Sequence, residues 1–280
     1  MKSCVIDIGG GLRGIYGAGV LDGFAEQNIK FDVCIGISAG SANIAAFTAG
    51  QKGRNYNFYC DYSLRREYMS ASNMLKTGSY IGLDYIYRTL SNEGGEDPLN
   101  YDNIAAFDGE IYVVATDVQT GKPVYFNKSD FIRNDYGIIC ASCAIPAVCR
   151  PYEVKGKKYC DGGVSDPVPI DFALNLGCDK IYLIITRPID FVMDSRLENT
   201  AAKLYSVKYP EVSRALKARA DMYNKSMIKA KELEKEGKCV IIAPDDCCGV
   251  DTLTRDRQKL DMLYRKGFAD GQKAISKIES

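Results

Sequence analysis

The chain of 280 residues contains no histidine. Histidine is the most frequent general acid or base of hydrolases and the commonest metal ligand. Its absence excludes a Ser-His-Asp triad, a Cys-His dyad and a histidine-ligated metal. Any hydrolytic mechanism in this chain must therefore use a different base.

The chain also lacks an excess of charge, because 36 lysines and arginines balance 36 aspartates and glutamates. A neutral chain has no global attraction for nucleic acid or for an anionic membrane. We therefore expect no nucleic-acid partner, and any basic patch must be local. An apolar run of about 18 residues is absent too, so we expect no membrane-spanning helix.

Cysteine is abundant, but its 11 residues are odd in number and scattered. Cys140 and Cys143 form a single C-x-x-C without the further ligands that zinc requires. Others, such as Cys34 and Cys239, lie in apolar runs where a thiol behaves as a small hydrophobe. We expect reduced, structural cysteines. Because the first residues do not show the order of a signal peptide, we expect a cytoplasmic protein.

Apolar strand-like runs alternate with segments of helical spacing along the chain. The expected strands are residues 4–8, 31–37, 110–116, 123–126, two short runs around Gly156, 180–186 and 239–243. The expected helices are residues 15–26, 41–50, 130–143, 169–176 and 254–277. This alternation predicts a three-layer αβα fold with a mainly parallel central sheet. Since no linker or repeat interrupts it, we expect one domain over residues 1–280.

Two segments could add a cap or a lid to this domain. Residues 56–103 are rich in tyrosine, arginine and asparagine and are broken by glycines, which predicts short helices and loops. Their tyrosines either line an acyl pocket or belong to the core and its rim. Residues 200–236 form a charged helical region that is either a lid pressing on lipid or a surface helix with its apolar face on the core. Glutamates interrupt its basic face, which favours the surface helix.

The first glycine motif consists of Gly9, Gly10, Gly11, Leu12, Arg13 and Gly14. It fits G-x-G-x-x-G between a strand and a helix, where backbone N–H groups and a helix N-terminus favour an anion. The anion could be the pyrophosphate of a dinucleotide. That interpretation requires an acidic residue at the end of the second strand, whereas Asp32 stands at its beginning.

The second motif consists of Gly36, Ile37, Ser38, Ala39 and Gly40. It is G-x-S-x-G between an apolar strand and an alanine-rich helix, the context of a nucleophile elbow. The glycines on either side avoid clashes that a Cβ would cause in the strained turn. Ser38 could instead be an ordinary N-cap of the following helix. The glycine loop upstream, which can supply oxyanion donors, favours the nucleophile.

Without histidine, either the site is inactive or a different group accepts the proton of Ser38, and a carboxylate within direct hydrogen-bond reach could do so. A free carboxyl is a weak base at neutral pH, and burial would raise its pKa. Spacing alone does not choose among the 36 acids. Asp161 ends an expected strand and precedes Gly162 and Gly163, a position that presents a side chain at a sheet edge. Asp-Gly-Gly is also an ordinary turn.

Three blocks of this sequence resemble the patatin-like phospholipases in order and approximate spacing: GGGLRG at 9–14, GISAG at 36–40 and DGG at 161–163. ASCAIP at 141–146 is similar to the small-residue block that precedes the aspartate in that family. The resemblance covers about residues 5–170. One departure is Asp166, where such proteins often carry asparagine.

The resemblance implies an acyl hydrolase with a Ser-Asp dyad that needs neither metal nor organic cofactor. It implies Ser38 as nucleophile, Asp161 as general base, backbone amides around Gly10 and Gly11 as oxyanion hole, and Arg13 as a residue that orients lipid phosphate. The implied substrate is a lipid acyl ester, hydrolysed by a phospholipase, lysophospholipase or carboxylesterase, and peripheral contact with a membrane is compatible with it.

Two other functions stay open at this stage. One is a catalytically weak lipid-binding or regulatory protein on the same fold, against which the intact Ser38 and Asp161 argue. The other is a dinucleotide-binding protein, which the first glycine motif alone would allow.

Overall fold

The computed structural model describes residues 1–276, with the side chain of Leu197 excepted. Within that part of the chain, eight strands form one sheet of order β5-β6-β3-β2-β1-β7-β8, with β4 paired to β3. The strands are β1 (Ser3–Asp7), β2 (Val33–Ile37), β3 (Glu110–Asp117), β4 (Pro123–Asn127), β5 (Tyr152–Val154), β6 (Lys157–Asp161), β7 (Lys180–Ile184) and β8 (Cys239–Ile242). The five strands β3, β2, β1, β7 and β8 pair in parallel, and β4, β5 and β6 add antiparallel pairs.

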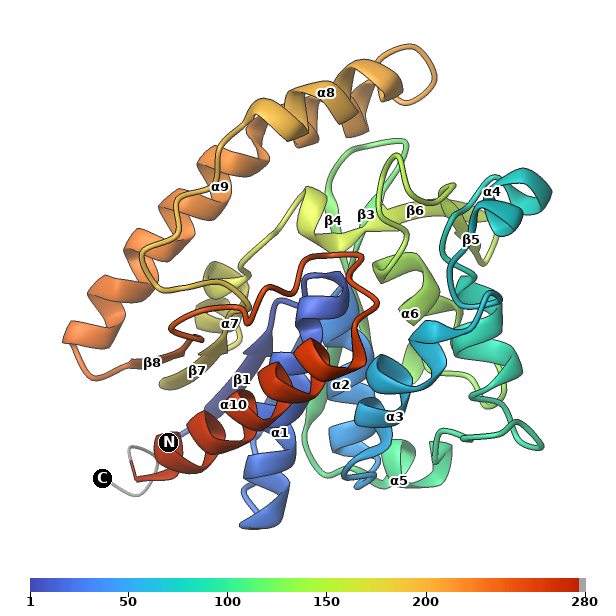
Figure 1. Ribbon diagram of the computed structural model, residues 1–280. Helices are drawn as coiled ribbons and strands as arrows, with labels where there is room; N and C mark the ends of the chain where they lie inside the picture. The colour runs from blue at the N-terminus through green and yellow to red at the C-terminus, as the bar shows by residue number, and fades with distance from the viewer. Residues whose placement is uncertain (277–280) are drawn as a thin grey trace.

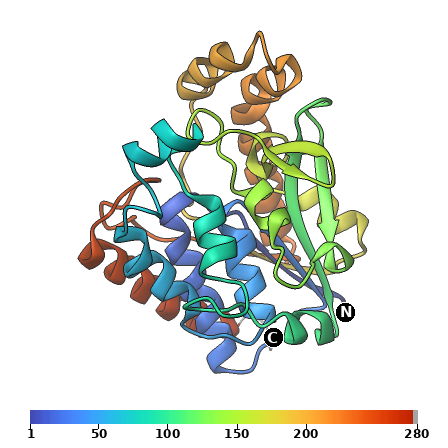
Figure 2. The same cartoon turned by 90° about the vertical axis from the view of Figure 1, so that its right-hand side faces the viewer.

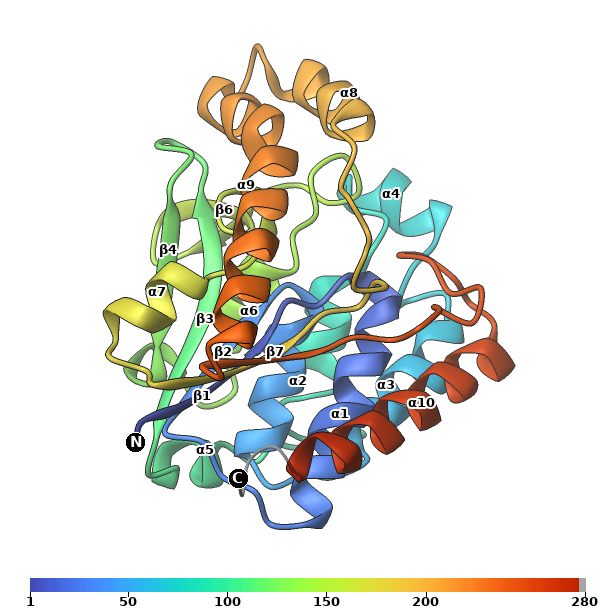
Figure 3. The same cartoon turned by 90° about the vertical axis from the view of Figure 1, so that its left-hand side faces the viewer.

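Helices cover both faces of this sheet, as Figure 1 shows. One face carries α1 (Ile15–Glu26), α2 (Ala39–Thr48) and α10 (Arg257–Ile275), and the other carries α7 (Ile170–Asn175) and α9 (Pro210–Lys235) (Figure 3). Side chains alternate between the two cores, so that Val5 of β1 joins the first and Ile6 the second. The predicted three-layer α/β fold with a mainly parallel sheet is confirmed.

The remaining helices are short, and all except α5 lie toward the end of the sheet that holds the two motifs, whereas α5 lies at the opposite end, before the start of β3 (Figure 3). They are α3 (Arg54–Cys60), α4 (Ala71–Thr77), α5 (Tyr101–Ala106), α6 (Gly137–Ser142) and α8 (Arg196–Tyr205). Figure 2 shows α8 and the adjoining end of α9 projecting beyond the sheet. The segment expected as one charged helical region is thus two helices, and α9 buries one face that includes Leu216, Tyr223 and Met227.

The helix predicted over residues 130–143 is wrong in its first half. Asn127 and Asp130 close a capping box around a single 3₁₀ turn. Asn134 then takes a positive φ of 61°, which ends any helical path, and α6 begins only at Gly137. The helix predicted to end at Lys277 ends at Ile275, and Lys277 lies outside the described residues.

Helices α1 and α10 approach each other backbone to backbone through facing glycines. A Cβ on Gly19 would lie 2.2 Å from the carbonyl oxygen of Tyr264, and one on Gly267 would lie 2.2 Å from that of Tyr16. Hydroxyl groups reinforce the contact, since Tyr264 donates to Asp22 at 2.7 Å. The last helix is therefore built into the core beside the first.

We predict that Gly267→Ala destabilises the protein. Alanine is the better helix former by about 1 kcal/mol, but its methyl group would force the two helices apart. Overpacking of this kind typically costs about 1–3 kcal/mol, measurable by urea denaturation. The control Met262→Ala changes an exposed side chain of α10 and should shift stability by less than about 0.5 kcal/mol. Equal stability of Gly267→Ala and the natural chain would contradict the close contact.

Candidate active site

Sheet topology brings Ser38 and Asp161 together. One edge of β3 pairs with β4. On its other edge, Ile37 at the end of β2 lies opposite Val114, and Asp161 at the end of β6 lies opposite Ala115. Because β2 runs parallel and β6 antiparallel to β3, the two strands approach end to end. The serine after β2 therefore meets the aspartate that ends β6.

Ser38 has an unusual backbone conformation, with φ 54° and ψ −132°. Such conformations cost about 1–3 kcal/mol and persist only where surrounding contacts hold them. Here the Ser38 N–H donates to Ser142 Oγ at 2.8 Å, and the Ser142 hydroxyl donates to the Val114 carbonyl at 2.6 Å. The Ser38 hydroxyl makes no capping bond to α2, which disfavours the N-cap interpretation.

The glycines of the two motifs are required by close packing. A Cβ on Gly40 would lie 2.1 Å from the carbonyl oxygen of Asp7, and one on Gly9 would lie 2.4 Å from that of Ile37. A Cβ on Gly36 would lie 2.4 Å from Cα of Ser41. The first glycine loop thus packs directly against the serine turn.

The first glycine loop presents unused backbone donors beside Ser38. Gly9, Gly10 and Gly11 have φ angles of 67°, 128° and 61°, which favour glycine. The N–H of Gly9 donates to Asp7 Oδ1 at 2.9 Å, and that of Leu12 donates to the Thr252 carbonyl at 2.9 Å. Among residues 1–276 no hydrogen bond engages the N–H of Gly10 or Gly11. These two amides are available to an anion.

Asp7 is a buried polar centre that the motif analysis missed. Burial raises its pKa to about 6, while hydrogen bonds from Asn43 at 2.8 Å and from Gly9 act in the opposite direction. Asn43 also donates to the Gly14 carbonyl at 2.8 Å and accepts from the Tyr59 hydroxyl at 3.2 Å. An aspartate inside the apolar run CVIDI was the signal that could have revealed it.

Asp161 is buried, with 7% of its surface exposed. Burial raises its pKa, and three neighbours oppose that rise: the Ser38 side chain, the charge of Arg219 and the N–H of Gly163. The Gly163 N–H donates to Asp161 Oδ1 at 2.9 Å, while Arg219 Nε donates to the Gly163 carbonyl at 2.7 Å. Arg219 was missed because it lies in the charged region expected to be surface.

Gly162 and Asp166 complete the loop after β6. A Cβ on Gly162 would lie 2.1 Å from the carbonyl oxygen of Val114, so this position also excludes a side chain. The Tyr125 hydroxyl donates to Asp166 Oδ2 at 2.5 Å. Burial raises the pKa of Asp166 to about 6. Its carboxylate therefore has a structural partner outside the Ser38–Asp161 pair.

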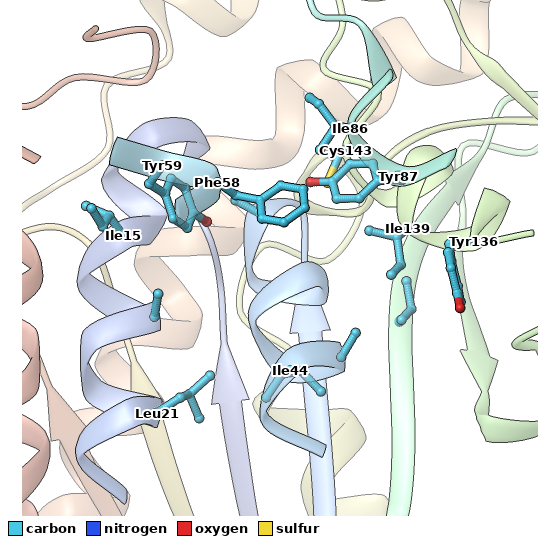
Figure 4. Close-up of a cluster of buried hydrophobic side chains, with 14 of the residues drawn as sticks. Ile15, Leu21, Ile44, Phe58, Tyr59, Ile86, Tyr87, Tyr136, Ile139 and Cys143 are labelled. Atoms are coloured by element: carbon cyan, nitrogen blue, oxygen red, sulfur yellow. The ribbon is translucent and has the colours of Figure 1, made fainter. Parts of the chain in front are cut away.

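A mostly apolar pocket opens at Ser38. Its walls include Gly11, Leu12, Ala39 and Ala42 near the serine, and Phe58, Tyr59, Tyr68, Met69, Ile86, Tyr87 and Cys143 farther away. Figure 4 shows Phe58 between Tyr59 and Tyr87, above the helix that carries Ile44. Several tyrosines of the segment 56–87 thus line this pocket.

The structure disfavours a dinucleotide at the first glycine motif. Asp32, the candidate partner for a ribose, accepts hydrogen bonds from the N–H and hydroxyl of Ser3 at 2.7 and 2.9 Å. Ser3 begins β1, whereas the glycine loop follows the end of that strand. Asp32 and the loop therefore lie at opposite ends of the sheet.

The fold and this geometry define an α/β protein with a hydrolase-like serine turn at the end of a parallel strand. The family model described as patatin-like phospholipase matches residues 8–174. The chain belongs to the patatin-like phospholipase family. A second family model, Domain of unknown function (DUF6363), matches residues 209–280.

Individual relatives agree with this assignment. The chain is 34% identical over 185 residues to the uncharacterized protein YjjU of Escherichia coli, covering 64% of this chain and 50% of YjjU. It is 24% identical over 289 residues to lysophospholipase nte1 of Aspergillus fumigatus, covering 97% of this chain and 18% of that protein. The chain thus spans half or less of these relatives. The crystal structure of VipD from Legionella pneumophila shares the fold, with TM-score 0.50 and 14% identity over 98% of this chain and 66% of VipD.

We predict that Asp166→Asn stabilises the protein in a pH-dependent way. The folded chain keeps the Asp166 proton up to about pH 6, whereas the unfolded chain releases it near pH 4, so the stability of the natural chain falls between these values. Asparagine stays neutral and still offers an oxygen to Tyr125. The variant should be similar to the natural chain near pH 4 and up to about 3 kcal/mol more stable near pH 7.5 in urea denaturation. A pH-independent difference would contradict this.

Proposed function

We propose that this protein is a serine hydrolase of lipid acyl esters, with Ser38 as nucleophile and Asp161 as general base. The observation that carries the proposal is a strained Ser38 whose side chain lies beside a buried Asp161 in a chain without histidine. The patatin-like family and the lysophospholipase relatives support a lipid ester as the substrate class.

In this mechanism Ser38 Oγ attacks the ester carbonyl while Asp161 accepts the serine proton. The N–H groups of Gly10 and Gly11 stabilise the tetrahedral oxyanion, and a single such donor is typically worth about 3 kcal/mol. Protonated Asp161 then donates to the leaving alcohol. A water molecule, activated by the same carboxylate, releases the fatty acid and restores Ser38.

A carboxylate can serve as the base here because of its surroundings. Burial raises the pKa of Asp161 and so makes it more basic than a free aspartate. Its position beside the Ser38 side chain allows direct proton transfer without an intervening imidazole. The charge of Arg219 limits the rise in pKa, which favours the ionised form that the mechanism needs.

The apolar pocket is suited to the acyl chain of the substrate. It begins at Ser38 and Ala39 and continues between aromatic side chains such as Phe58 and Tyr87. Burial of each CH₂ group of the chain there would contribute about 0.8 kcal/mol to binding. The apolar pocket lies next to the paired side chains of Ser38 and Asp161. This combination argues against a purely regulatory protein.

Contact with a membrane and a cytoplasmic location stay predictions. Within residues 1–276 no helix combines the length and the apolar character needed to cross a membrane. Cosedimentation with lipid vesicles would test peripheral contact, and fractionation of cells would test the location.

We predict that Ser38→Ala and Asp161→Asn each lower kcat for short p-nitrophenyl esters by at least about 10³-fold. Ser38→Ala should also abolish stoichiometric labelling by a fluorophosphonate. The exposed control Ser129→Ala should label like the natural chain, and Asp166→Asn should retain most of the activity. Persistence of esterase activity in folded Ser38→Ala protein would refute the proposal.

We predict that Ala42→Leu shortens the acyl chain that the enzyme prefers. Ala42 lies on α2, one turn after Ser38, and lines the pocket. The larger side chain should lower the ratio of kcat/KM for p-nitrophenyl dodecanoate over butyrate by about 10-fold, since pocket contacts of one or two methylenes are worth about 1–3 kcal/mol. The matched control Ala106→Leu, at an exposed position of α5, should leave this ratio unchanged. An unchanged ratio in Ala42→Leu would exclude this pocket as the acyl site.

A further inference from the structure

Two helices beside the pocket leave apolar side chains exposed to solvent. Helix α4 buries none of its residues, and its Leu75 is 88% exposed. On α8, Leu204 is 68% exposed, and Val207 in the turn that follows this helix is 94% exposed. Single exposed leucines are ordinary, whereas several apolar side chains that gather at one end of a molecule mark an interaction surface.

Helix α4 is held by its two caps and not by burial. At its N-terminus the Ser70 hydroxyl accepts the N–H of Asn73 at 3.1 Å. At its C-terminus Gly78, with φ 75°, donates its N–H to the Met74 carbonyl at 2.9 Å. Caps of these two kinds satisfy the end groups of a helix without covering its side chains. Met74 and Leu75 are therefore presented to solvent from a formed helix.

Helix α8 packs on the protein through one side only. Ala202 and Tyr205 are buried there, in a cluster that also contains Leu216 of α9. Lys203 and Leu204 lie between these two buried residues in the sequence and are both exposed. The exposed side of α8 thus combines an apolar side chain with a basic one, and packing does not require it.

Both helices attach to one segment, residues 145–150, whose first residue lines the pocket. The hydroxyl of Tyr205 on α8 accepts the N–H of Ala147 at 3.3 Å. Shortly after the end of α4, the N–H of Tyr80 donates to the Val148 carbonyl at 2.8 Å. Figures 2 and 3 show α4 and α8 at the same end of the molecule, away from both termini. The exposed side chains of the two helices therefore belong to one face, beside a wall of the pocket.

This face, called the docking face below, also has a local excess of positive charge. Its segments are residues 64–78, 147–150 and 203–208. They contain six basic residues and one acid, Glu67, whereas the whole chain contains 36 of each. Arg65 pairs with Glu96. The other five basic residues are exposed and form no ion pair with any residue of the described chain: Arg66, Lys76, Arg150, Lys203 and Lys208. Their charge is available to an anionic partner.

We propose that the docking face attaches the protein to the surface of an anionic lipid bilayer. Leu75 and Val207 enter the boundary between head groups and acyl chains, while the basic side chains pair with anionic head groups. A bilayer offers both kinds of partner at once. The proposal rests on the proposed lipid ester hydrolase and adds the surface through which its site reaches the substrate.

This orientation gives the pocket a direct supply of lipid. With the docking face on the bilayer, the segment 145–150 and the pocket behind it lie next to the lipid. An acyl ester can then move from the bilayer to Ser38 with little exposure of its chain to water, which lowers the free-energy cost of the transfer. A water-soluble ester needs no such transfer. Changes of the docking face should therefore affect vesicles and spare soluble esters.

Cosedimentation of the full chain carrying Ser38→Ala with lipid vesicles tests the docking face without any turnover. One set of vesicles contains phosphatidylcholine alone, and the other contains phosphatidylcholine and phosphatidylglycerol in equal parts. We expect at least about 10-fold tighter binding to the anionic vesicles. High salt should remove this difference, because it screens exposed charges.

Leu75→Ser combined with Val207→Ser should weaken binding to the anionic vesicles by at least about 10-fold, because the apolar contacts with the bilayer are lost. The matched control, Ile228→Ser combined with Met262→Ser, changes exposed apolar side chains of α9 and α10 outside the docking face and should bind normally. A melting temperature for each variant verifies its fold. In the chain with its natural Ser38, the docking-face variant should keep kcat/KM for p-nitrophenyl butyrate.

Lys203→Gln combined with Lys208→Gln tests the charge of the docking face separately. This variant should lower the preference for anionic over neutral vesicles by about 5-fold or more, because two cations at the bilayer surface are lost. The matched control, Lys225→Gln combined with Lys235→Gln, changes two exposed lysines of α9 outside the docking face and should keep the preference.

Equal binding to the two kinds of vesicle, or binding that survives unchanged in Leu75→Ser with Val207→Ser, would overturn the docking face. A dimer in sedimentation velocity that dissociates in that variant would assign the face to a second copy of the chain and overturn the bilayer assignment. Failure of the hydrolase proposal shows itself separately, as esterase activity that persists in Ser38→Ala, and leaves the vesicle results intact.

Discussion

The buried carboxylate of Asp7 joins the segments on which the site depends. One oxygen accepts the N–H of Gly9 and so shapes the start of the glycine loop, while the other accepts the side-chain amide of Asn43 on α2. A Cβ on Gly17 would lie 2.3 Å from Asp7 Oδ2, and one on Gly40 would lie 2.1 Å from its carbonyl oxygen. Since burial raises the pKa of Asp7, these donors are what keeps its ionised form in the core. The glycine loop, α1 and the serine turn therefore all pack against the same residue, Asp7.

Because the chain has no histidine, the sheet topology has to place a carboxylate next to the serine. In a triad, imidazole spans the distance between serine and aspartate, so the two can lie on separate segments. In the proposed dyad the carboxylate must reach the serine directly, and the sheet places the two side by side because β2 and β6 meet end to end on one edge of β3. The burial that this arrangement imposes also raises the pKa of Asp161. The same contact thus supports both the position and the basicity that the proposed mechanism requires.

Local features of the site could be predicted from the sequence, and long-range ones could not. Ser38 follows from a strand, a glycine-flanked turn and a helix that are adjacent in the chain. Asp161 could not be chosen by spacing, because its position depends on the pairing of β6 with β3, 45 residues away at the contact with Thr116. The contact of Arg219 with the loop after Asp161 could not be predicted for the same reason. Helical spacing shows which residues share a face of α9 but not which segment that face packs against. The helix expected at 130–143 failed because Asn134 adopts a left-handed backbone that side-chain pattern does not encode.

The segment beyond the patatin-like match at residue 174 completes the site. Thr186 donates to the Gly9 carbonyl, and the Thr252 carbonyl accepts the N–H of Leu12, so both ends of the glycine loop are held by later residues. Arg219 holds the loop after Asp161 through the Gly163 carbonyl. In addition, α10 packs on α1 through facing glycines, so the last helix belongs to the same core as the first. Removal of this segment would therefore remove the contacts that hold the glycine loop and the loop after Asp161, even though Ser38 and Asp161 both lie within the matched residues.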